Sequence, residues 1–114
     1  MNNGKILIVQ FWAETTITET IARNLLHLLT RRAKMTPIED VIIRTYPSLD
    51  GKGGIGITAF QPFVESFCAL DTYPEQNRVV LLFYSCRHFD TEALISVFKE
   101  LIKPAKINYN IVYL

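Results

Sequence analysis

The sequence predicts an α+β fold, a two-layer α/β sandwich in which a mostly antiparallel sheet carries two helices on one face. Two segments repeat apolar residues at helical spacing, and six others are rich in β-forming residues, in the order β-α-β-β-β-β-α-β. The chain has 114 residues, of which 49% are hydrophobic and 20% charged. This size and composition predict that residues 1–114 form a single domain with one core.

The chain begins with a strand and a helix. Lys5–Trp12 is a nearly continuous apolar run, which is typical of a core strand. Thr16 and Glu19 have the spacing of a capping box, in which the threonine hydroxyl accepts a hydrogen bond from a backbone amide of the first helical turn. We therefore expect a helix that runs to about Ala33, with an apolar face formed by Ile17, Ile21, Leu25, Leu28 and Leu29.

The middle of the chain is expected to contain strands only. These strands are predicted at residues 41–46, 55–61, 63–70 and 78–85. The glycine-rich segment 47–54 and the segment 72–77 are predicted to turn the chain, and Asp50-Gly51 is suited to positive φ. Pro62 indicates the end of its strand or an edge position, because proline cannot donate a hydrogen bond to a neighbouring strand.

A second helix and a last strand complete the sequence. Asp90 or Thr91 can cap this helix, and Pro104 stops it. Its apolar face is formed by Leu94, Val97, Phe98 and Leu101. The strong alternation over residues 107–113 predicts a half-buried final strand.

The charge and cysteine content exclude several classes of function. The formal net charge is +1, and the densest basic segment, Arg31, Arg32 and Lys34, falls at a predicted helix end, where cations favour the helix dipole. We therefore expect no binding to nucleic acid or to an anionic membrane. Cys68 and Cys86 lack metal-ligand spacing, which indicates no metal site and two free thiols in a reducing, cytoplasmic compartment. The longest apolar run is far below the roughly 20 residues of a membrane helix.

A glycine pattern at residues 51–56 matches the dinucleotide fingerprint in its letters. Gly51, Gly53 and Gly56 have the required spacing. In that motif the loop follows a strand and opens a helix, whose N-terminus holds the pyrophosphate. Here a strand is predicted after the glycines, so we expect a flexible hairpin loop.

Two further segments contain residue types that carry chemistry. Strand alternation places Ser66 and Cys68 on one face and Glu65, Phe67 and Asp71 on the other. A polar pair of this kind favours a solvated face, and catalysis is the alternative. Cys86, which precedes Arg87 and His88, is either a buried structural cysteine or a thiol with a lowered pKa. Ser66, Cys86 and His88 could form a nucleophile and base set, which the spacing does not test.

Several of these segments together resemble the prokaryotic S-adenosylmethionine decarboxylases over nearly the whole chain. The first strand is similar to the family's Gly-x-His-Leu-x-x-Glu-aromatic pattern. Glu65-Ser66 and, after five residues, Thr72 to Glu75 are similar to its Glu-Ser-His-x-x-x-His-Thr-Trp-Pro-Glu. Tyr84-Ser85-Cys86 is similar to its Phe-Thr-Cys-Gly, at the same distance from the turn.

The resemblance implies a pyruvoyl-dependent decarboxylase of polyamine synthesis. Members cleave their own chain between the glutamate and the serine, which here are Glu65 and Ser66, and the serine becomes the pyruvoyl group. That group binds the substrate amine and acts as an electron sink for loss of CO₂. By position, Cys86 would protonate the product, and Thr58 falls near a family serine that assists processing. The substrate would be S-adenosylmethionine or a related amino acid, and the protein would be a homodimer.

Departures from the family pattern leave alternatives open. The histidine needed for processing falls on Asp71, and the histidine after the cleavage serine falls on Phe67. A carboxylate is a much weaker base than an imidazole. One alternative is therefore a non-processing relative that binds S-adenosylmethionine or a partner chain as a sensor or regulator. Another is a lyase that acts on S-adenosylmethionine without a pyruvoyl group, with Glu65 or Asp71 as the base.

Overall fold

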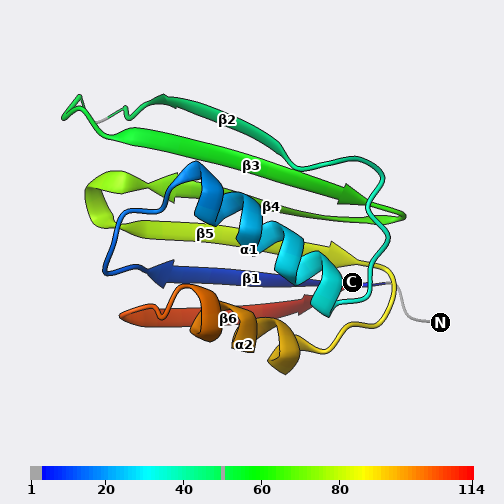
Figure 1. Cartoon of the computed structure of the whole chain (residues 1–114). Helices are drawn as coiled ribbons and strands as arrows, with labels where there is room; N and C mark the ends of the chain where they lie inside the picture. The colour runs from blue at the N-terminus through cyan, green and yellow to red at the C-terminus, as the bar shows by residue number, and fades with distance from the viewer. Residues whose placement is uncertain (1–3, 50) are drawn as a thin grey trace.

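The structure, a computed structural model, describes residues 4–49 and 51–114. Its elements are β1 (Lys5–Trp12), α1 (Glu19–Arg32), β2 (Ile42–Pro47), β3 (Ile55–Phe63), β4 (Ser66–Tyr73), the 3₁₀ turn η1 (Pro74–Gln76), β5 (Arg78–Ser85), α2 (Thr91–Leu101) and β6 (Lys106–Tyr113). The sheet order is β2-β3-β4-β5-β1-β6, and all neighbouring strands are antiparallel. Both helices cover the same face of the sheet (Figure 1). The predicted fold class and element order are confirmed.

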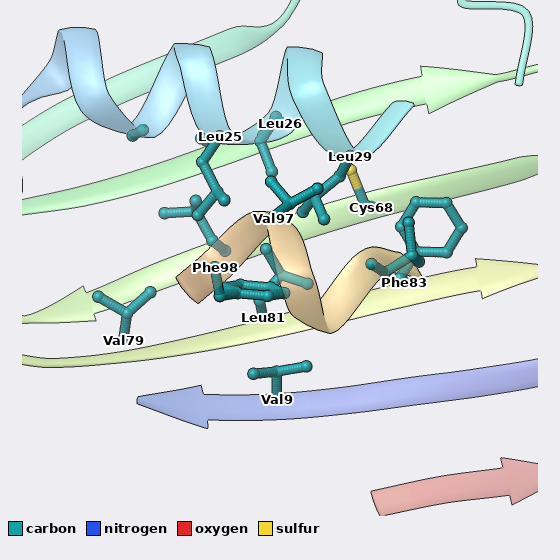
Figure 2. Packing of buried hydrophobic residues seen from close by; sticks show 14 of the residues in the cluster. Val9, Leu25, Leu26, Leu29, Cys68, Val79, Leu81, Phe83, Val97 and Phe98 are labelled. Carbon is teal, nitrogen blue, oxygen red and sulfur yellow. The ribbon is translucent and has the colours of Figure 1, made fainter. Parts of the chain in front are cut away.

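The core lies between the sheet and the two helices. Side chains at alternate positions of each central strand point toward the helices, so β1 buries Leu7, Val9 and Phe11 and leaves the residues between them half-buried. Figure 2 shows this layer, with side chains of the strands meeting those of α1 and α2. Burial of each such side chain contributes roughly 1.5–3 kcal/mol. The core is thus large enough to hold the sheet against the helices.

Both helices are capped by side chains. The Thr18 hydroxyl accepts a hydrogen bond from the amide of Ile21, so the capping box predicted at Thr16 is wrong. Several threonines near this position can serve as caps, and capping by Thr18 puts Glu19 in the first helical turn, where its charge favours the dipole. In α2, Asp90 is the cap and accepts a hydrogen bond from an amide of the first turn.

The hairpin between β3 and β4 turns later than the sequence predicts. Pro62 lies inside β3, because the pairing of β3 with β2 ends at Phe60 and no ladder donor is needed beyond it. The chain therefore reverses at residues 64–65, and β4 begins at Ser66. Thr72, which was predicted in a turn, lies in β4 and accepts a hydrogen bond from the Ile57 amide.

The centre of the sheet face opposite the helices is apolar, and the described residues form no layer over it. We call it the open face and define it by the outward-pointing side chains of Ile8, Phe60, Phe67, Leu82 and Tyr84. The Phe67 ring lies 5.6 Å from that of Phe60 and 5.5 Å from that of Tyr84. Phe60 and Leu82 are each 36% exposed. Partly exposed apolar side chains grouped in this way are typical of a binding surface.

The last strand, β6, lies at the edge of the sheet and is less buried than predicted. Only Ile107 and Ile111 pack against the core. Tyr109 is exposed and donates a hydrogen bond to Glu92 of α2, and this bond raises the tyrosine pKa. Neither α1 nor α2, nor any other helix in the described residues, has the length and apolarity needed to cross a membrane.

Candidate functional site

The glycine-rich loop does not form a dinucleotide site. It connects β2 to β3 in an antiparallel hairpin, and no helix follows it. The amide of Ser48 donates to the carbonyl of Gly54 across the loop. Gly51 has a φ of +71°, as predicted, whereas Asp50 lies outside the described residues. The prediction of a hairpin loop is confirmed.

The Glu65–Ser66 peptide bond lies at the tip of the hairpin between β3 and β4. Phe63 pairs with Ser66, so the turn consists of Val64 and Glu65 alone. Glu65 has a φ of +61°, a left-handed conformation that costs a residue with a Cβ roughly 1–2 kcal/mol. The sequence predicted Glu65 within a strand, whereas it occupies this strained and exposed turn. The bond that the resemblance marks for cleavage therefore joins an exposed residue with a strained backbone to Ser66, which is buried.

Ser66 and Cys68 point into the core, so the predicted solvated face is wrong. Ser66 is 8% exposed and Cys68 is 0% exposed, because this side of β4 is covered by the helices. Burial raises the pKa of the Cys68 thiol well above its usual value. Phe67 and Asp71 lie on the other side, as strand alternation predicted.

A chain of hydrogen bonds holds the Ser66 hydroxyl. Its Oγ donates to Oγ of Ser85, directly opposite on β5, at 2.8 Å. Ser85 also accepts from the Arg87 amide at 2.9 Å and donates weakly to the sulfur of Met35 at 4.0 Å. Because the Met35 sulfur is a weak acceptor, this chain orients the serine but ends in no base.

Cys86 lies on the other side of the same peptide bond. Its Sγ is 3.6 Å from the Glu65 carbonyl oxygen and 3.7 Å from Oε2 of the same residue. A donor at a carbonyl oxygen can stabilise the negative charge that forms there when a nucleophile attacks the carbonyl carbon. His88 makes no hydrogen bond or ion pair with Ser66 or Cys86 in the described part of the chain, so the structure does not form the nucleophile and base set with this histidine.

Thr58 and Asp71 form a second group on the open face. The Thr58 hydroxyl donates to Oδ1 of Asp71 at 2.6 Å, and it lies 2.9 Å from the hydroxyl of Tyr46. Asp71 and Ser66 are five positions apart in β4, which separates them by roughly 16–17 Å. The structure therefore brings together Glu65, Ser66 and Cys86 and, apart from them, Thr58 and Asp71.

Sequence reasoning missed two members of these groups, Ser85 and Tyr46. Ser85 could have been found from the turn, since strands that flank residues 74–77 pair Tyr73 with Arg78 and place Ser66 opposite Ser85. Tyr46 has no such signal, because its strand follows a long loop. Its ring lies over Gly56, where an added Cβ would be 2.5 Å from the ring. A metal site is not indicated by the described residues, which contain no cluster of three or more metal-binding side chains.

Comparisons with known proteins agree with this architecture. The sequence matches the S-adenosylmethionine decarboxylase family over residues 8–113. The fold is similar to the crystal structure of the adenosylmethionine decarboxylase from Aquifex aeolicus, with a TM-score of 0.76 and 14% identity. That match covers 98% of this chain and 90% of the other. No curated protein matches the sequence.

Proposed function

This chain belongs to the S-adenosylmethionine decarboxylase family, and from that we propose that it is a precursor that cleaves itself between Glu65 and Ser66. The product is a pyruvoyl-dependent decarboxylase of S-adenosylmethionine or a related amino acid. One observation carries the proposal, namely the 3.6 Å contact between the Cys86 thiol and the carbonyl that Ser66 would attack. Family membership supports self-cleavage and pyruvoyl-dependent decarboxylation, and this contact supports cleavage at the Glu65–Ser66 bond.

The first step of self-cleavage is an acyl shift within the hairpin. Ser66 Oγ bonds to the carbonyl carbon of Glu65 while the bond from that carbon to the Ser66 nitrogen breaks, and the hydroxyl proton passes to the nitrogen. Cys86 donates to the carbonyl oxygen as charge develops on it. Ser85 holds the hydroxyl at the start. The strained φ of Glu65 favours opening of the turn.

The second step splits the chain. A base removes the Cα proton of Ser66, the bond from Cβ to the ester oxygen breaks, and Glu65 leaves as a free carboxylate. Water then replaces the nitrogen of residue 66, which departs as ammonia. The pyruvoyl group formed at this position supplies a covalent attachment for the substrate amine and an electron sink for loss of CO₂. Ser66 is 8% exposed, so the group would form where water has little access.

Intact-mass measurement under denaturing conditions tests the proposal. Incubation of the purified chain is expected to give two fragments, residues 1–65 and 66–114, whose summed mass exceeds the precursor by one water less one ammonia. Ser66→Ala is the matched control and should remain a single species. A wild-type chain that stays unsplit after prolonged incubation rejects pyruvoyl catalysis.

Within the described part of one chain, no hydrogen bond joins the Ser66 side chain to a carboxylate or an imidazole that could act as the base for the second step. We propose that a homodimer pairs two open faces and completes each site with Asp71 and Thr58 of the other copy. The apolar side chains of the open face support this pairing, as does the distance of Asp71 from Ser66 within one chain. Leu82→Glu, at the centre of this face, should yield a monomer by sedimentation, whereas an unchanged mass rejects the interface.

A second candidate function is that of a non-processing relative. Phe67 and Asp71 occupy positions where the family has histidines, and Phe67 stacks with its neighbours on the open face. In this case the open face holds S-adenosylmethionine or a partner chain, and Ser66 keeps a structural hydrogen bond. Calorimetry of the unsplit chain with S-adenosylmethionine distinguishes binding of this ligand from binding of a partner chain. Absence of binding heat would rule out S-adenosylmethionine as the ligand.

A further inference from the structure

A cavity on the helix side of the sheet shares one residue, Met35, with the hydrogen-bond chain of the candidate site. Its volume is about 450 Å³, which is within the range of small-molecule pockets. It is open to solvent on one side and is bordered by the C-terminal half of α1, the segment 35–40 and strand β3. Its lining residues include Arg31, Met35, Pro37, Glu39, Asp40 and Gln61. Apart from Met35, none of them belongs to the groups around Ser66 or Asp71.

One charged group of the cavity is already neutralised. Asp40 accepts from Arg23 at 3.2 Å, from His27 at 2.9 Å and from the Val41 amide at 2.8 Å. The hydrogen bond from His27, followed by that from Val41, lowers the pKa of this carboxyl. Asp40 therefore forms a fixed wall of the cavity and has little capacity left for a ligand.

Two other charged groups of the cavity have no ion pair in the part of the chain that the structure describes. These are the guanidinium of Arg31 and the carboxylate of Glu39. Met35 and Pro37 supply apolar surface in the same cavity. The cavity thus presents one positive group, one negative group and an apolar wall.

Gln61 provides a buried acceptor. Its side-chain nitrogen donates to the carbonyls of Glu39 at 2.7 Å and Pro62 at 3.1 Å, which fixes the amide orientation. Its oxygen has no partner among the described residues, although the residue is 1% exposed. Every solvent-inaccessible side-chain oxygen or nitrogen in the described residues has a partner. The Gln61 oxygen must therefore reach open space, and the cavity is the space beside it.

We propose that this cavity binds a free α-amino acid with an apolar side chain. Its ammonium group is bound by the Gln61 oxygen and the Glu39 carboxylate, and its carboxylate by Arg31. Its side chain packs against Met35 and Pro37. A zwitterion matches both unpaired charges. The second ammonium of a diamine would be repelled by Arg31, and the second carboxylate of a dicarboxylate would be repelled by Glu39. The site does not depend on self-cleavage.

NMR titration of the full-length, ¹⁵N-labelled chain with L-leucine and L-methionine tests this site. We expect saturable shifts at the Gln61 side-chain amide and along residues 35–40. Isopentylamine and 4-methylpentanoate each lack one charge of leucine and should bind roughly tenfold or more weakly, since each loses a charge-assisted hydrogen bond. Arg31→Gln and Glu39→Gln should weaken leucine binding by about the same factor.

Lys34→Gln is the control, because it removes an exposed cation near the end of α1 that does not line the cavity. Its leucine affinity should equal that of the wild type. The proposal is wrong if neither amino acid produces saturable shifts, if isopentylamine binds as tightly as leucine, or if Lys34→Gln weakens binding as much as Arg31→Gln. Because the readout is binding, a chain that never self-cleaves still gives a decisive result.

Discussion

The Cys86 thiol lies 3.6 Å from the carbonyl oxygen of Glu65, although the two residues are 21 positions apart. The contact forms because β4 and β5 pair in a register that ends with Ser66 opposite Ser85. Glu65, which precedes Ser66, and Cys86, which follows Ser85, then lie next to each other at the hairpin tip. The same register thus supplies both the hydroxyl that holds Ser66 and the thiol at the carbonyl.

Replacement of Cys86 is expected to slow self-cleavage. Cys86→Ala removes the donor at the Glu65 carbonyl oxygen and should lower the rate roughly ten- to a hundredfold, somewhat less than the loss of a stronger oxyanion donor. Cys86→Ser keeps a hydrogen-bond donor, so its cleavage rate should lie between that of Cys86→Ala and that of the wild type. A time course of intact mass measures these rates. Equal rates for Cys86→Ala and wild type would show that the contact has no part in cleavage.

Mixing two inactive chains is expected to restore cleavage. If Asp71 acts on the other copy, Asp71→Asn and Ser66→Ala should each remain unsplit alone. In a mixed dimer, the Asp71→Asn chain keeps Ser66 and receives Asp71 from its partner, so it alone should cleave. Mass spectrometry of coexpressed chains identifies which one splits. Cleavage of Asp71→Asn by itself contradicts the role of Asp71.

The two cysteines are expected to differ in reactivity. Cys68 is fully buried and its pKa is raised by burial, so the native protein contains almost none of its thiolate. Cys86 is half-buried and should react with iodoacetamide in the folded protein. Peptide mapping after a short exposure should show label on Cys86, and label on Cys68 only after unfolding. Equal labelling of both native thiols would contradict the packing of β4.

Acid stability is expected to depend on Asp40. Its pKa is lowered from 3.8 by the hydrogen bond from His27 and other contacts. A lowered carboxyl pKa stabilises the folded state above the unfolded value, and this contribution is lost as the pH falls through the folded value. Asp40→Asn should therefore be less stable than wild type near neutrality, with a smaller difference below pH 3.8. Urea unfolding measures the free energy of unfolding of both proteins at each pH. A stability difference that grows on acidification would contradict the lowered pKa of Asp40.

The sequence predicted the elements well because each has a strong local pattern. The helical periodicity before Ala33 and the alternation of β-forming residues depend only on neighbouring positions. Its errors occurred where long-range pairing decides the outcome. Pro62 was predicted at the end of its strand or at an edge position; the strand end was wrong, but the edge position holds, because the pairing of β3 with β2 ends at Phe60. Ser66 and Cys68 looked solvated, but the helices happen to cover their side of β4.

The site was predicted only in part for a related reason. Glu65, Ser66 and Cys86 were proposed from a sequence resemblance, and the structure brings them together. Asp71 belonged to the same resemblance, yet it lies far along the strand and on the opposite face. Sequence spacing reports distance along the chain and does not say which copy of a protein supplies a residue. This information comes only from three-dimensional structure or from mixing experiments.

Because of the strand order, self-cleavage would change the number of separate chains that must associate for the domain to fold. A cut after Glu65 leaves β1, β2 and β3 in one peptide and β4, β5 and β6 in the other. In the order β2-β3-β4-β5-β1-β6, the junctions β3-β4, β5-β1 and β1-β6 then join different peptides. The two peptides interlace, and each contributes one helix to a shared core. In the proposed homodimer, unfolding of the precursor separates two chains, whereas unfolding of the cleaved form separates four peptides, so the thermal midpoint of the cleaved form depends more steeply on protein concentration.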